Sequence, residues 1–145
     1  AIITCTPLLN SCKPNSLAIE ESEPQIEVVL DINELGGKSR NTVESFLGSA
    51  TSIDETSKCG VRVDYNKHNT EIVYINDKAD WITVSNIDHI SFDQSAIEHF
   101  GFPSQSPSFK SNFVMRWDYV YGFMGISIFK GQKNCDYIYV KTNTK

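Results

Sequence analysis

Cysteine and histidine carry the most reactive side chains of this sequence, and their spacing limits the chemistry they can do. The four cysteines stand at positions 5, 12, 59 and 135, and the three histidines are His68, His89 and His99. No Cys-x-x-Cys pair and no cysteine–histidine cluster has the spacing of a zinc site, so we expect no structural metal. The histidines stand among polar residues, and we expect them to be exposed to solvent.

Motifs of the common enzyme classes are missing from the sequence as well. It contains no glycine-rich phosphate loop, no Gly-x-Ser-x-Gly and no His-Glu-x-x-His. Cys59, followed by Gly60, is a candidate nucleophile, but no histidine stands near it in a suitable pattern, and a disulfide or a buried thiol is the alternative. We therefore predict a protein that is not an enzyme and needs no cofactor.

The N-terminal cysteines suggest export. Leu9-Asn10-Ser11-Cys12 resembles the lipobox of bacterial lipoproteins, in which case residues 1–11 end a signal peptide and Cys12 carries the lipid. The alternatives are a local disulfide between Cys5 and Cys12, or free thiols. With either the lipid or the local disulfide, Cys59 and Cys135 are left and can form a bridge. The lipid and the local disulfide both imply an exported protein, because disulfides persist in oxidising compartments.

Length and charge define the class of protein. The chain has 145 residues, 40% of them hydrophobic, and a formal charge of −5. No apolar run approaches the roughly 18 residues of a membrane-spanning helix. The negative charge argues against a nucleic-acid partner. Residues 1–37 carry six acidic and one basic side chain, so we predict a signal remnant or flexible acidic arm over 1–24 and a single domain over 25–145.

An internal repeat organises this domain. The matching segments are 61–65 with 115–119 and 43–46 with 97–100, at an offset of 54 residues, and 80–84 with 136–140, at an offset of 56. Three matches in the same order predict two tandem units, about 37–85 and about 91–141.

Each unit is predicted to be a short helix followed by three strands. Ser39 and Asp93 can cap the two helices, and Gly48 and Gly101 can end them. The strands are expected at about 59–66, 70–76, 79–85, 112–121, 123–130 and 135–141. An extra leading strand is expected at Gln25–Asp31. The predicted fold class is α+β, with two tandem α-β-β-β repeats forming one antiparallel sheet and both short helices on one face.

Alternation along the strands assigns the faces of this sheet. The core face is predicted to hold Val61, Val63, Tyr65, Ile72, Tyr74, Ile82, Val84, Met115, Trp117, Tyr119, Ile126, Ile128, Ile138 and Val140. The other face is predicted to carry Trp81, Phe129, Tyr137, Tyr139, Arg116 and Asp118. Because aromatic residues and arginine are enriched at interfaces, we predict that this second face binds a protein partner. The alternatives are that the N-terminal arm or a second subunit covers it.

Charged pairs recur on the same face. Arg62 and Asp64 in the first unit match Arg116 and Asp118 in the second. Their repetition predicts ion pairs that cross between neighbouring strands.

The turn after the first long strand differs between the units. It is polar at 66–70 but aromatic at 120–125, where Tyr121, Phe123 and Met124 are predicted to contact a partner. The alternative is that these two rings pack against the loop at 102–109.

Tandem α-plus-antiparallel-sheet units with a concave face resemble the β-lactamase-inhibitor-protein architecture. A single unit is similar to the outer-membrane assembly lipoprotein BamE and its relatives. Gly37-Lys38-Ser39, Val43 and Leu47-Gly48 carry the resemblance. The proline that usually follows Leu-Gly is missing there, and Phe100–Pro103 comes closer to the pattern.

The resemblance implies a periplasmic binding module without naming its partner. We therefore predict a non-enzymatic protein-binding module of the bacterial cell envelope, either periplasmic or anchored at the outer membrane. The alternative is a soluble inhibitor or immunity protein against a secreted enzyme, which the acidic balance and the aromatic turn favour.

Overall fold

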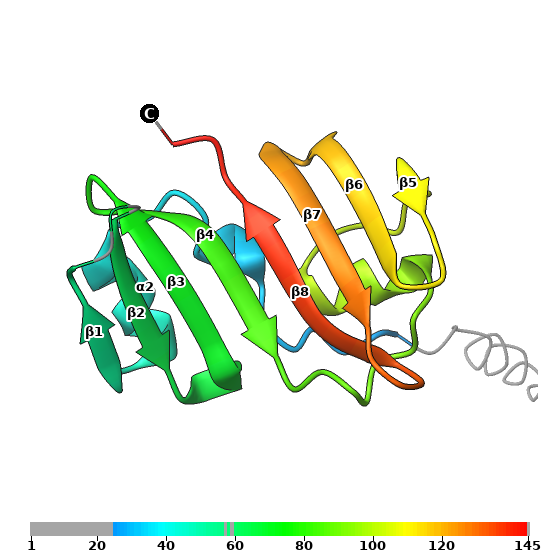
Figure 1. Ribbon diagram of the computed structural model, residues 1–145, viewed down its shortest axis with the longest axis horizontal. Helices are drawn as coiled ribbons and strands as arrows, with labels where there is room; N and C mark the ends of the chain where they lie inside the picture. The colour runs from blue at the N-terminus through cyan, green and yellow to red at the C-terminus, as the bar shows by residue number, and fades with distance from the viewer. Residues whose placement is uncertain (1–24, 57, 59, 145) are drawn as a thin grey trace, which may run out of the picture.

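One antiparallel sheet dominates the computed structural model, which describes residues 25–56, 58 and 60–144. Its order is β1-β2-β3-β4-β8-β7-β6-β5 (Figure 1). The strands are β1 (Ser52–Asp54), β2 (Val61–Tyr65), β3 (Thr70–Ile75), β4 (Lys78–Ser85), β5 (Phe109–Lys110), β6 (Val114–Val120), β7 (Phe123–Lys130) and β8 (Cys135–Lys141). The α+β class is confirmed, and the six long strands lie within two residues of their predicted bounds. The short edge strands β1 and β5 were not predicted.

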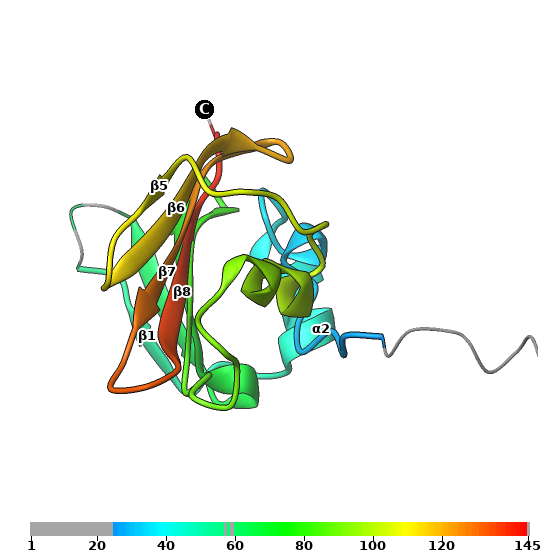
Figure 2. The same cartoon turned by 90° about the vertical axis from the view of Figure 1, so that its right-hand side faces the viewer.

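The helices lie on one side of the sheet (Figure 2). They are η1 (Ile32–Glu34), α2 (Arg40–Leu47) and η3 (Gln94–Phe100), and a short turn η2 (Lys67–Asn69) joins β2 to β3. As predicted, the side chains of Ser39 and Asp93 cap α2 and η3 by accepting hydrogen bonds from backbone N–H groups of the first turn. Gly48 and Gly101 end these helices with positive φ angles of 81° and 90°.

The helix predicted for the second unit, η3, is a 3-10 helix rather than an α-helix. In a 3-10 helix, residues three positions apart lie directly above one another. This geometry places both Ile97 and Phe100 in the core with no exposed surface.

The leading strand predicted at Gln25–Asp31 is wrong. This segment runs along the helix layer, where the N–H of Val29 donates to the carbonyl of His99 at 2.7 Å. The side chain of Asp31 accepts a hydrogen bond from the N–H of Asn33 at 3.0 Å and so caps η1. The segment therefore leads into a helix instead of a strand.

Strand pairing follows the same register on the two sides of the sheet. Val61 of β2 pairs with Tyr74 of β3. Met115 of β6 pairs with Ile128 of β7, and both of these residues stand 54 positions later in the chain.

The two sides meet at the central pair, β4 and β8. Ile82 of β4 pairs with Ile72, and Val140 of β8 pairs with Ile126. Ile72 and Ile126 are 54 positions apart, whereas Ile82 and Val140 are 58 apart. The predicted offset of 56 for the last strand is therefore two residues short, because the turn before β8 is longer than the turn before β4. A shift of two residues keeps every side chain on its predicted face.

The core lies between the sheet and the helices. Of the residues predicted for the core face, Val61 is half-buried, Tyr119 is exposed and all others are buried. Tyr119 breaks the alternation because its φ of 49° rotates the strand at this position. Its side chain is 81% exposed, so the prediction that Tyr119 belongs to the core is wrong.

Among the helices of the described ranges, none combines the length and apolar character needed to cross a membrane.

Candidate partner-binding surface

The face of the sheet away from the helices, here called the open face, is built from rows of paired residues. The first row, from β2 to β6, is Arg62, Val73, Trp81, Lys141, Gly125 and Asp118. The second row is Asp64, Glu71, Thr83, Tyr139, Ser127 and Arg116. A third row holds Ser85, Tyr137 and Phe129. Figure 1 views the sheet from this side, with the helices behind it.

Four aromatic side chains gather at the middle of this face, and we call them the aromatic centre: Trp81, Phe129, Tyr137 and Tyr139. Trp81 and Tyr139 meet edge to face, with ring centroids 5.4 Å apart and planes at 61°. Phe129 and Tyr137 stack at 4.6 Å and 17°. Trp81 is 36% exposed, and the other three are half-buried. The structure therefore brings together four predicted contact residues from three adjacent strands.

Charged residues flank the aromatic centre on both sides. On β2 and β3, Arg62 Nε lies 3.8 Å from Glu71 Oε1, which is an ion pair between strands. On β6, Arg116 Nε lies 3.1 Å from Asp118 Oδ1 within the same strand. The predicted cross-strand pairing is thus wrong for Arg116, because Gly125 and Ser127 supply no acidic group on β7.

Lys141 connects the aromatic centre to a buried carboxylate. Its Nζ lies 2.9 Å from Asp80 Oδ1 and 5.5 Å from the centroid of the Trp81 ring. The hydroxyls of Thr142 and Thr144 also donate to Asp80 Oδ1, at 3.0 and 2.7 Å. The Lys141 ammonium is therefore held in one place against Trp81, and a fixed cation stabilises the ring by a cation–π interaction.

The hydrogen bonds to Asp80 change the pKa of its carboxyl. Burial raises the pKa of the carboxyl, but hydrogen bonds from Thr144, Lys141 and Thr142 together outweigh burial, and the pKa of Asp80 is lowered. Asp80 and Lys141 were not singled out from the sequence. Only the pairing of β4 with β8 brings them within reach of each other.

A depression of about 230 Å³ lies beside Trp81. Its lining residues are Arg62, Glu71, Val73, Trp81, Thr83 and Tyr139. Its lining combines two aromatic residues, the apolar side chain of Val73 and the ion pair between Arg62 and Glu71. Such a surface can bury an apolar side chain of a partner while the charges at its rim stay hydrated.

The aromatic hairpin packs inward, as the alternative interpretation expected. The Tyr121 ring stacks on Phe102 with centroids 5.4 Å apart, and its hydroxyl donates to the Pro103 carbonyl at 2.7 Å. Phe123 is buried edge-on against Phe102 at 5.5 Å. Tyr121 and Phe123 therefore hold the hairpin against Phe102 and do not lie on the open face.

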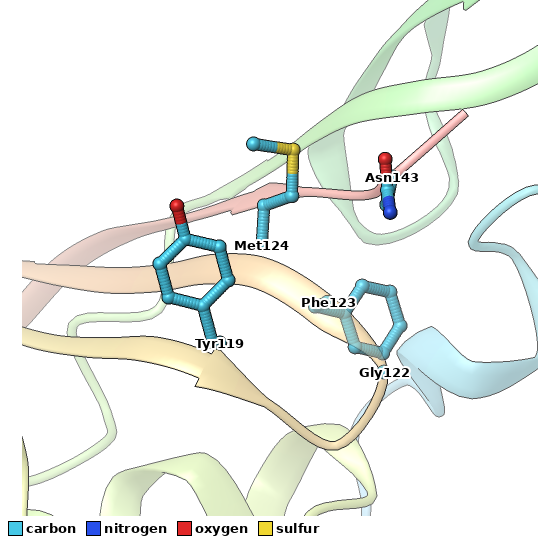
Figure 3. Close-up of a pocket in the computed structure, with 5 residues that line it drawn as sticks. All are labelled: Tyr119, Gly122, Phe123, Met124 and Asn143. Carbon is cyan, nitrogen blue, oxygen red and sulfur yellow. The ribbon is translucent and has the colours of Figure 1, made fainter. Parts of the chain in front are cut away.

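Tyr119 and Met124 are large hydrophobic residues that are exposed at this end of the sheet. They line a hollow of about 280 Å³ with Gly122, Phe123 and Asn143 (Figure 3). The Met124 Sδ lies 4.0 Å from Lys141 Nζ, so the hollow adjoins the aromatic centre. Sequence reasoning missed Tyr119, because strict alternation places it in the core.

Three of the cysteines with a predicted lipid or disulfide lie outside the described residues: Cys5, Cys12 and Cys59. Cys135 is a free, buried thiol whose Sγ lies 3.5 Å from the carbonyl of Ser91. Burial raises the pKa of Cys135 to about 12, which keeps the thiol protonated and unreactive at neutral pH.

The predicted exposure of the histidines holds in full only for His89. His68 and His99 are half-buried. His99 Nδ1 lies 2.9 Å from the carbonyl oxygen of Glu27. Within the described ranges, no three His, Cys, Asp or Glu side chains are grouped so that they could hold a metal ion.

Comparisons with protein-family models, with curated proteins and with solved structures gave no match for this chain.

Proposed function

We propose that this protein is a non-enzymatic protein-binding module of the bacterial cell envelope, and that it binds its partner through the open face. The observation that carries the proposal is the aromatic centre, which lies on the face that the helices leave uncovered. Interfaces commonly consist of an aromatic and apolar centre with a polar rim. Trp81 at the centre and the charged pairs at the flanks have this arrangement.

The cell-envelope assignment rests on residues 9–12 and on the fold-level resemblance to the β-lactamase-inhibitor-protein and BamE-like architectures. In this proposal Cys12 carries a lipid, and the acidic segment that follows it links the anchor to the sheet. A Cys12→Ser variant should lose incorporation of a labelled fatty acid and leave the membrane fraction. Labelling that persists in this variant would contradict the anchor.

Affinity capture tests the binding face. The full chain, immobilised as bait, is compared with a Trp81→Ala/Tyr137→Ala double variant and with Phe46→Ala. Phe46 is 40% exposed, close to the 36% of Trp81, but it belongs to α2 in the helix layer. We expect the double variant to lose its partner and Phe46→Ala to keep it, because hot spots are buried aromatic residues at the middle of an interface. Equal capture by all three proteins would end the proposal for this face.

A soluble inhibitor of a secreted enzyme is the second candidate, and the exposure of Tyr119 favours it. An exposed tyrosine with a left-handed backbone is an unusual feature that can serve contact with a partner. In this case a Tyr119→Ala variant should fold normally and lose inhibition, whereas the double variant in the aromatic centre should keep it.

We also propose that the chain is a tandem duplication of one α-β-β-β unit. The equal register of β2–β3 and β6–β7 supports this, as do the capped helix before each set of strands and the antiparallel seam between β4 and β8. Superposition of backbone 39–85 on 93–141 tests the proposal, and Arg62 should then fall on Arg116.

A further inference from the structure

We infer that the open face binds a second copy of this chain, face to face, across a two-fold axis parallel to the central strands β4 and β8. This inference rests on the proposed function, because it names the partner of the same face. It is carried by the order of charges along the rows of paired residues.

The first two rows carry opposite charges at their two ends. In the first row, Arg62 stands at the β2 flank and Asp118 at the β6 flank. In the second row, Asp64 stands at the β2 flank and Arg116 at the β6 flank. The sign of the charge therefore reverses from one flank to the other within a row, and also from one row to the next within a flank.

A two-fold axis along the central strands turns this order into charge complementarity. Rotation by half a turn exchanges the β2 and β6 flanks but leaves each row at its own height along the strands. Arg62 then faces Asp118 of the second copy, and Asp64 faces Arg116 of the second copy. Each copy meets the same contacts in its partner, which is the requirement for a closed dimer. Complementary charges at a rim fix the register of two partners and exclude others.

The axis passes through the aromatic centre. In the order β2-β3-β4-β8-β7-β6, the midpoint between the two charged flanks lies between β4 and β8, the strands that carry Trp81, Tyr137 and Tyr139. Two sheets related in this way keep their strands nearly aligned and pack about 10 Å apart, which aromatic side chains can fill. The helices of each copy would form the outer layers of the dimer.

The size of the open face sets the affinity that we expect for the dimer. Six strands at about 4.8 Å spacing give a width of about 24 Å between the flanks. This is a small interface, so we expect association in the micromolar range rather than a permanent dimer. The net charge of −5 opposes association of identical chains, and salt of roughly 0.15 M screens this repulsion.

Analytical ultracentrifugation of the full chain between about 1 and about 200 µM tests the inference. We expect a monomer–dimer equilibrium for the wild type. Trp81→Ala should weaken the dimer by at least about ten-fold, and Phe46→Ala, in the helix layer, should leave it unchanged. A dimer that Trp81→Ala does not weaken would overturn the use of this face.

Charge reversal tests the proposed register. Arg62→Asp alone places two acidic groups against each other at both flanks, and Asp118→Arg alone places two arginines against each other. Each single variant should therefore associate at least about ten-fold more weakly than the wild type. Mixing the two variants should restore the dimer, because Asp at 62 of one chain then faces Arg at 118 of the other. Circular dichroism checks that the variants are folded, and failure of the mixture to associate contradicts the register.

A chain that stays monomeric over the whole concentration range overturns the inference that the partner is a second copy. The broader proposal is judged separately, by whether the Trp81→Ala/Tyr137→Ala variant loses a captured partner of another kind. A concentration-dependent dimer that depends on Trp81 supports both.

Discussion

Asp80 shows how a single buried charge supports the open face. Its carboxylate is almost fully buried and accepts hydrogen bonds from Lys141, Thr142 and Thr144. These contacts join the start of β4 to the end of β8 and hold Lys141 beside Trp81. A buried carboxylate is stable only when such partners replace its hydration.

The Asp80→Asn substitution should destabilise the protein by about 2 kcal/mol, because hydrogen bonds to a charged acceptor are replaced by weaker ones. Urea denaturation followed by circular dichroism measures the change. Asp136→Asn is the matched control: Asp136 is exposed near the start of β8, and its substitution should change stability by no more than about 0.5 kcal/mol. Equal effects of the two substitutions would contradict the structural role of Asp80.

The difference in stability between the wild type and Asp80→Asn should depend on pH in a defined way. Because the pKa of Asp80 is lowered in the folded state, its contribution is fully present above the unfolded pKa of about 3.9. The contribution is lost as the pH falls through the lower, folded pKa. The stability difference between the wild type and Asp80→Asn should therefore be constant from neutral pH down to about pH 5 and shrink below about pH 4. A difference that grows on acidification would contradict this network.

At the scale of elements, the β6–β7 hairpin separates residues that support the fold from residues available for contact. Tyr121 and Phe123 pack on Phe102, in the loop that follows η3. Tyr119 and Met124 are exposed on the same hairpin. The hairpin is thus anchored by two rings and presents two other side chains to solvent.

Phe123→Ala should cost about 3 kcal/mol of stability, because it removes a buried ring and leaves a cavity beside Phe102 and Gly36. Met124→Ala, at a 37% exposed position next to it, should cost less than about 1 kcal/mol. Thermal unfolding of both variants measures the difference. A stable Phe123→Ala variant that lost only partner binding would instead support the interpretation of Phe123 as a contact residue.

At the scale of the whole molecule, one core joins the two halves of the chain. Ile82 and Val140 pair across the seam between β4 and β8, and both are fully buried. The sheet continues across this seam without a break. Neither half therefore has a complete core by itself, and the two should unfold together.

The two tryptophans test this cooperativity, because Trp81 belongs to β4 and Trp117 to β6. In a Trp117→Phe variant the fluorescence reports β4 alone, and in a Trp81→Phe variant it reports β6 alone. Within each variant, at one fixed protein concentration, the fluorescence and circular dichroism transitions in urea should coincide. Two separate midpoints in either variant would show that the halves unfold independently.

The sequence by itself determined the local features of this fold. Apolar alternation placed the six long strands, and the hydroxyl of Ser39 and the carboxylate of Asp93 fixed the starts of α2 and η3. The same alternation put Trp81, Phe129, Tyr137 and Tyr139 on one face. These features depend on neighbours close in the chain, which is why the residue pattern is sufficient to predict them.

Only the tertiary structure decided which surfaces are covered and which residues meet. Gln25–Asp31 has the alternation of a strand, yet it packs beside η3, where the carbonyl of His99 accepts the N–H of Val29. Tyr119 leaves the core because the strand rotates at its positive φ, and Asp80 meets Lys141 only because β4 pairs with β8. Each of these outcomes depends on a contact between segments far apart in the chain, and such contacts leave no periodic signal in the sequence.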